Sequence, residues 1–131
     1  MDLAYLAVML MVVEYALFGT MVAIARSRYK VPAPATTGHA DFERYFRVQQ
    51  NTLEQLIVTI PALWIMALSL SPLWAALLGF LFVATRVFYA MGYYKSAQGR
   101  HWGFVAGSVA TGGLVVGAFV GIAKDLFFMA R

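Results

Sequence analysis

The chain has 131 residues, of which 62% are hydrophobic and 12% charged, and its formal net charge is +4. Roughly 25% of the residues of a soluble domain are charged, so this composition excludes an ordinary soluble enzyme and indicates an integral membrane protein. The chain contains no cysteine, which excludes disulfides, thiolate metal sites and a cysteine nucleophile.

Four apolar segments predict helices near residues 3–29, 42–70, 73–95 and 101–127. Each is long enough to cross about 30 Å of hydrocarbon, which takes roughly 20 helical residues. Because unpaired strand edges cannot face lipid, we expect a single all-α domain, residues 1–131, folded as an up-down four-helix bundle. The first segment lacks the basic flank and cleavage site of a signal peptide, so we expect it to be retained as a membrane span.

The basic residues predict the orientation of this bundle. Only Lys124 and Arg131 lie on the side of the termini, whereas seven basic residues flank the first and third connections: Arg26, Arg28, Lys30, Arg44, Arg47, Lys95 and Arg100. The positive-inside rule then places both termini on the non-cytoplasmic side, and it explains the net charge better than nucleic-acid binding does. The short loops favour a bacterial inner membrane over the endoplasmic reticulum.

The fourth segment carries small residues at helical spacing. Gly103 and Gly107 form one pair, and Gly113, Gly117 and Gly121 continue the pattern. Such residues let helices approach closely in lipid. Packing within one bundle is the favoured interpretation, and self-association through this helix is the alternative.

Ionisable residues inside apolar segments need a partner or a wet cavity, and Glu14, Glu54 and Arg86 are the candidates here. For Glu14 we favour a structural contact with another helix. In the second segment, polar residues at i, i+3, i+7 and i+10 predict one stripe on a helix: Arg44, Arg47, Asn51 and Glu54. The two arginines alone are also consistent with a topology signal at the membrane interface.

A second polar stripe, Arg86, Tyr89 and Tyr93, ends the third segment, with Arg100 just beyond. Tyrosines alone are consistent with an interfacial belt, but two polar stripes on one membrane side predict a pocket. Guanidinium groups suit carboxylates, and a carboxylate and an amide suit an amine, so we expect a small zwitterionic ligand. No metal site is expected, because His39 and His101 are isolated.

Residues 42–54 and 86–100, together with Ala25-Arg26 and Thr36-Thr37-Gly38, resemble the superfamily of membrane-associated proteins in eicosanoid and glutathione metabolism (MAPEG). The similarity is greatest to the branch that holds leukotriene-C synthase, type 2 microsomal glutathione transferase and the five-lipoxygenase-activating protein. The resemblance implies a homotrimer that binds glutathione between subunits near the cytoplasmic face.

The resemblance also implies residue roles. Arg100 matches the arginine that activates the glutathione thiol, which has an ordinary pKa of roughly 8.5. Arg86 matches an arginine beside the site, and seven residues match those that hold glutathione: Arg26, Arg47, Gln49, Asn51, Glu54, Tyr89 and Tyr93. Ser96 matches a serine near the active arginine, for which a thiol hydrogen bond and a helix-end role both remain open.

Three positions depart from the family pattern. Ser27 replaces a second arginine that assists epoxide opening, Gln55 replaces an aromatic residue and Ile57 replaces a proline. Leukotriene synthesis itself is therefore not expected, while the charged centre of the site is retained.

The sequence thus predicts a membrane-bound glutathione transferase for lipophilic electrophiles that arrive through the bilayer, with glutathione peroxidase activity toward lipid hydroperoxides as a second activity. Such a protein would serve detoxification or lipid metabolism. A non-catalytic lipid-binding or scaffold protein of the same fold is the alternative. A transporter is disfavoured because the chain shows no inverted repeat.

Overall fold

The computed structural model describes residues 1–129. These residues form helices α1 (Asp2–Arg28), α2 (Ala40–Ser69), α3 (Pro72–Lys95) and α4 (His101–Met129), with a short 3-10 helix, η1 (Gln98–Arg100), before α4. No strand occurs within this range. All four α-helices are long and apolar enough to cross a membrane, which confirms the expected all-helical membrane fold.

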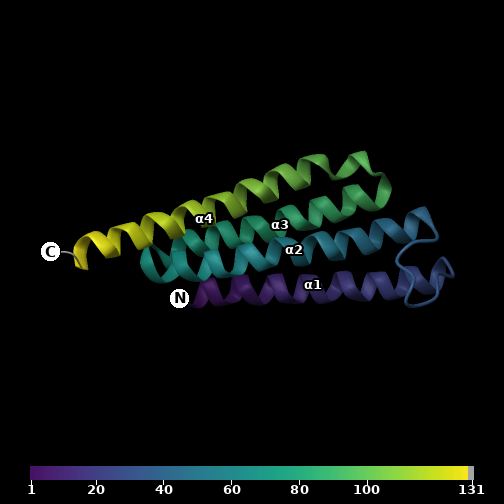
Figure 1. Ribbon diagram of the computed structural model, residues 1–131, viewed down its shortest axis with the longest axis horizontal. Coiled ribbons are helices and arrows are strands. Elements are labelled where there is room, and N and C mark those ends of the chain that lie inside the picture. The colour runs from purple at the N-terminus through teal and green to yellow at the C-terminus, as the bar shows by residue number, and fades with distance from the viewer. Residues whose placement is uncertain (130–131) are drawn as a thin grey trace.

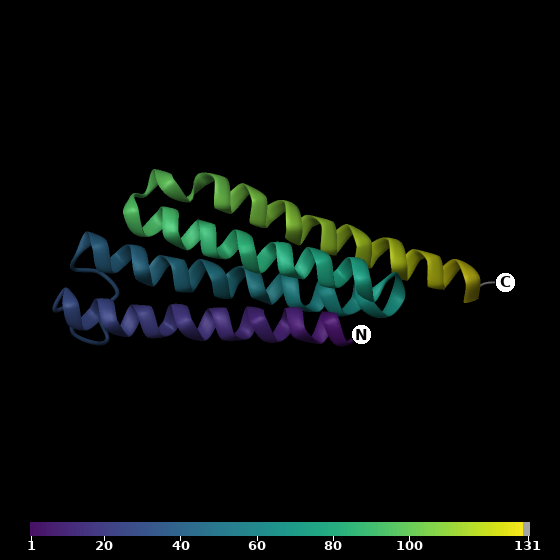
Figure 2. The same ribbon diagram turned by 180° about the vertical axis from the view of Figure 1, so that it is seen from behind.

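Consecutive helices run in opposite directions, as Figure 1 shows. The α1–α2 connection and the turn before α4 lie together at one end of the bundle, which we call the loop end, and the α2–α3 turn lies at the other end with the N-terminus. Seen from behind in Figure 2, the last part of α4 extends past the α2–α3 turn. Of the two basic residues expected at that end, Lys124 lies on α4, and Arg131 is outside the described residues.

Local signals fix the ends of the helices. Ser71 accepts a hydrogen bond from the Trp74 amide at 3.4 Å, and Pro72 occupies the first helical position of α3, where its missing N–H is not needed. Gly38 adopts a φ of 134°, a conformation open to glycine, immediately before the residue that caps α2. Pro61 lies inside α2, which continues to Ser69.

The glycines of α4 pack against the other helices of the same subunit. A Cβ atom on Gly103 would lie 2.5 Å from the backbone of Tyr89, and one on Gly117 would lie 2.5 Å from the sulfur of Met66. Gly121 is similarly tight against Ser69. These contacts account for the small-residue pattern through packing within one bundle, the favoured interpretation.

The outward faces of the helices are apolar. Large hydrophobic side chains are more than half exposed on every helix, for example Leu17, Leu68, Phe88 and Phe119. A surface of this kind is solvated by lipid tails, because water would penalise so much contiguous apolar area. The chain is an integral membrane protein.

Candidate functional site

A cavity of about 660 Å³ opens at the loop end of the bundle. It is lined by side chains from three helices and from the turn that precedes α4: Asn51, Tyr89, Ala97, Gln98, Arg100, His101 and Phe104. The polar part of the lining, which we call the polar wall, carries an amide, a phenol and a guanidinium, and Phe104 adds an apolar side chain. This combination suits a polar molecule next to a lipophilic one.

Two hydrogen bonds orient the polar wall. The Asn51 side-chain amide donates to the Tyr89 hydroxyl at 2.6 Å, which joins α2 to α3. The Arg100 guanidinium donates to the Tyr93 hydroxyl at 3.0 Å and lies 4.9 Å from the centre of the Tyr93 ring. Arg100 is exposed apart from this contact, so its remaining N–H groups can bind an anion in the cavity.

Arg86 supports this wall from inside the bundle. Its side chain is 1% exposed, donates to the Thr52 hydroxyl at 2.8 Å and stacks 3.9 Å from the centre of the Tyr89 ring. On α1, Glu14 is 6% exposed and interacts electrostatically with Arg86. Neither Glu14 oxygen has a hydrogen-bond partner among residues 1–129. The positive charge of Arg86 reduces the cost of burying the Glu14 carboxyl within the apolar bundle.

The turn that carries Arg100 packs directly on α3. A Cβ atom on Gly92 would collide with the Gly99 carbonyl, and one on Gly99 would collide with the Gly92 carbonyl. Ser96 accepts a hydrogen bond from the Gly99 amide at 3.0 Å, which is the helix-end role considered for this serine. The main chain of the turn therefore fixes where the Arg100 side chain begins.

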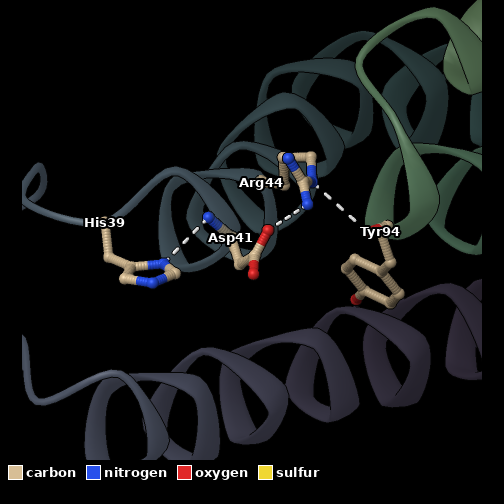
Figure 3. Close-up of polar contacts among 4 residues, drawn as sticks. All are labelled: His39, Asp41, Arg44 and Tyr94. Atoms are coloured by element: carbon tan, nitrogen blue, oxygen red, sulfur yellow. Dashed lines mark hydrogen bonds and ion pairs between the residues drawn. The ribbon is translucent and has the colours of Figure 1, made fainter.

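A polar chain fastens the first turn of α2 to the last turn of α3, as Figure 3 shows. His39 accepts a hydrogen bond from the Asp41 amide at 3.1 Å, and Asp41 forms an ion pair with Arg44. Arg44 in turn donates to the Tyr94 carbonyl at 3.3 Å. Arg44, the first member of the expected stripe, is thus occupied by structural contacts.

Arg26 lies outside the large cavity, at the end of α1. One of its terminal nitrogens donates to the carbonyls of Val31, Pro32 and Ala35 at 2.7 to 3.2 Å. Its guanidinium also stacks 4.7 Å from the centre of the Phe42 ring. Arg26 borders a separate, shallower cavity of about 440 Å³ with Ala23, Ser27, Lys30, Val31 and Pro32.

The other expected residues of α2 point in different directions. Arg47 and Glu54 are exposed on the outer face of the helix. The Gln49 side chain faces α1, where its nitrogen would lie 3.2 Å from a Cβ atom on Gly19. Among residues 1–129, the cavity therefore brings together only Asn51, Tyr89 and Arg100 of the expected residues, with Tyr93 and Arg86 as their supports.

The sequence model of the MAPEG family matches residues 3–120. This chain belongs to the MAPEG family. It is 49% identical over 102 residues to an uncharacterized protein of Synechocystis, covering 78% of this chain and 74% of that protein. It is 41% identical to microsomal glutathione S-transferase 2 of Mus musculus over 66% of this chain and 59% of that protein. It is also 35% identical to mouse leukotriene C4 synthase over 82% of this chain and 71% of that protein.

Sequence reasoning missed four residues that line the cavity of this MAPEG protein: Ala97, Gln98, His101 and Phe104. The first two lie in an irregular turn, where no helical period indicates a direction. His101 and Phe104 are three residues apart and therefore share a face of α4. That spacing could have indicated that they line the cavity together, but both residues belong to a long apolar segment.

Proposed function

We propose that this chain is a membrane-bound glutathione transferase that conjugates glutathione to lipophilic electrophiles. One observation carries the proposal. A single cavity joins the Arg100 guanidinium and the Asn51–Tyr89 pair to an apolar wall at Phe104. Membership of the MAPEG family supports glutathione as the co-substrate, because a relative at 41% identity is named a glutathione transferase.

In this proposal Arg100 stabilises the glutathione thiolate, the form that attacks electrophiles. Asn51, Tyr89 and Tyr93 hold the peptide near that guanidinium. Charged groups outside the cavity bind the ends of glutathione: arginines bind its carboxylates, and Glu54 binds its amine. The charged outer groups are Arg26, Arg47 and Glu54. The Gln49 amide is a further binding group outside the cavity, and Arg86 is the internal support of Tyr89.

The proposed reaction forms a carbon–sulfur bond between the thiolate and the electrophile. The cavity holds both reactants together, so the reaction gains from proximity. The electrophile reaches Phe104 from the bilayer, because this side chain lines the cavity and is 48% exposed. We include glutathione peroxidase activity toward lipid hydroperoxides as a second activity of the same site.

We further propose a homotrimer in which a neighbouring subunit completes each site. Arg47 and Glu54 are charged, exposed and next to long apolar side chains such as Ile57. Burial against another subunit and glutathione removes these charges from lipid. We propose that the basic loop end faces the cytoplasm of a bacterium, which the Synechocystis relative supports.

Calorimetric titration of glutathione into the purified protein in detergent tests the proposal. We expect binding to the wild type, and affinity at least tenfold lower in Arg47→Ala and Glu54→Ala. Arg28→Ala is the matched control, because Arg28 is exposed at the same end. If all three variants bind like the wild type, the proposed glutathione site is wrong.

Turnover of an aryl chloride tests the role of Arg100. We expect Arg100→Ala to lower kcat at least 100-fold while glutathione binding stays measurable, since the side chain acts on the thiol. Lys95→Ala removes an exposed positive charge nearby and serves as the control. Equal turnover in the wild type and Arg100→Ala would remove the proposed role.

A non-catalytic lipid-binding protein is the second candidate. The apolar side of the cavity, formed by Ala97 and Phe104, suits an acyl chain without any thiol chemistry. Absence of glutathione binding by the wild type would favour this function.

A further inference from the structure

His101 stands beside Arg100 in the large cavity, although neither stripe of polar residues contains it. It is the first residue of α4 and is exposed, and its ring contacts the edge of Trp102 at a centroid distance of 5.4 Å. Its imidazole has no hydrogen bond to the part of the chain that the structure describes. His39 differs, because it caps α2 and stacks on Tyr29. The His101 imidazole therefore makes no structural hydrogen bond within residues 1–129.

The neighbours of His101 indicate what lies against it. Phe104 is one helical turn farther along α4, away from the loop end, and lines the same cavity. A lipid whose acyl chain packs on Phe104 would present its oxidised group to His101. Arg100, the residue before His101, lines the same cavity, and the thiolate would be stabilised there. The two reactants then meet next to a guanidinium and an imidazole on adjacent residues.

We infer that His101 protonates the oxygen that leaves when a lipid hydroperoxide reacts in this cavity. The inference rests on the proposed function. It names His101 as the proton donor for the peroxidase activity and lipid hydroperoxides as the substrate class. The glutathione thiolate attacks the terminal peroxide oxygen, so that a sulfur–oxygen bond forms and the oxygen–oxygen bond breaks. The electron pair of the broken bond remains on the lipid oxygen, which takes the imidazolium proton and leaves as an alcohol.

The products of this step are a lipid alcohol, glutathione sulfenic acid and neutral imidazole. Sulfur is oxidised by two electrons and the peroxide is reduced by two. A second glutathione condenses with the sulfenic acid to give the disulfide and water. Ionisation of the next glutathione thiol releases the proton that recharges His101.

Histidine suits this task better than its neighbours in the cavity. Imidazole gains and loses a proton near neutral pH, whereas a guanidinium stays protonated and so cannot cycle. An alkoxide is a poor leaving group without a proton. Chloride leaves an aryl chloride without being protonated. Comparing the hydroperoxide with the aryl chloride therefore distinguishes the effect of proton donation from the effect of thiolate formation.

The test compares reduction of a fatty-acid hydroperoxide with conjugation of an aryl chloride, both at saturating glutathione. We expect His101→Ala and His101→Gln to lower the ratio of peroxidase to conjugation kcat/KM roughly 100- to 10,000-fold, the usual range for a lost general acid. Gln98→Ala is the matched control, because Gln98 lines the cavity but donates no such proton. Its ratio should match that of the wild type.

Added imidazole should restore peroxidase activity to His101→Ala and leave Gln98→Ala unaffected, a result that a structural role does not produce. Three results would each overturn the inference about His101 but not the proposed function. The first is an unchanged activity ratio in both His101 variants, and the second is a parallel loss of both activities that imidazole does not rescue. The third is a wild type that conjugates the aryl chloride but does not reduce the hydroperoxide. A wild type inactive toward both acceptors would overturn the proposed function as well.

Discussion

The Arg86 guanidinium lies 3.9 Å from the centre of the Tyr89 ring, deep between α2 and α3. The hydroxyl of the same ring accepts the hydrogen bond of Asn51 at the cavity wall. Tyr89 thus has one face on a buried charge and its polar tip at the candidate site. A change at Arg86 should therefore be detected in the cavity.

Arg86→Ala should strongly destabilise the protein. The substitution leaves the buried Thr52 hydroxyl without its donor, which costs about 1–3 kcal/mol, and it removes the positive charge that interacts electrostatically with Glu14. We expect a markedly lower thermal unfolding midpoint in detergent. Arg28→Ala, an exposed arginine at the end of α1, should leave the midpoint unchanged. Equal midpoints for the two variants would contradict the structural role of Arg86.

Tyr89→Phe removes the hydroxyl that holds the Asn51 amide. Since a single hydrogen bond contributes about 0.5–1.5 kcal/mol, we expect glutathione affinity to fall roughly 2- to 10-fold while the fold is retained. Titration calorimetry measures this change. Tyr5→Phe is the control, because Tyr5 packs on Trp64 near the opposite end of the bundle. Wild-type affinity in Tyr89→Phe would show that the Asn51–Tyr89 bond has no part in binding.

Two glycines of α4 should respond oppositely to alanine. A Cβ atom on Gly103 would lie 2.5 Å from the Tyr89 backbone, whereas one on Gly112 would have no atom within 4 Å. Gly103→Ala should push α4 away from α3 and lower both stability and activity. Gly112→Ala should be neutral or stabilise the helix by up to about 1 kcal/mol. Thermal unfolding of both variants checks the contrast, and similar destabilisation by both would argue against the packing described.

Arg26→Ala should release the loop between α1 and α2. The Arg26 side chain donates to three loop carbonyls, so its loss removes the clamp and lets the loop open more often. We expect limited proteolysis within residues 31–39 to become severalfold faster. Arg28→Ala should be cleaved at the wild-type rate, because among residues 1–129 the Arg28 guanidinium stacks only on its neighbour Tyr29. Identical rates for both variants would mean that other contacts hold the loop.

Hydropathy and turn chemistry were sufficient to predict the helical membrane fold. Ser71 and Pro72 mark the start of α3 in the sequence as clearly as they do in the structure. Lipid makes the prediction easier, because it requires every backbone group of a span to bond within its own helix.

The stripe on α2 was harder to interpret. Helical spacing groups Arg44, Arg47, Asn51 and Glu54, but their directions depend on partners far away in the sequence. Arg44 turns to the carbonyl of Tyr94, Asn51 turns to Tyr89, and the other two remain on the surface. Periodicity indicates a face of a helix, and only tertiary packing decides which part of that face borders a cavity.

The contact between Gly92 and Gly99 separates the placement of Arg100 from the shape of the cavity. Because main chain packs on main chain at this contact, the backbone sets the position of the Arg100 Cα atom, and the side chains at positions 97, 98 and 104 do not set it. The shape of the cavity can therefore be redesigned at these three positions while the Arg100 guanidinium keeps its place. This family member thus combines a guanidinium whose position the backbone sets with cavity side chains that can be exchanged.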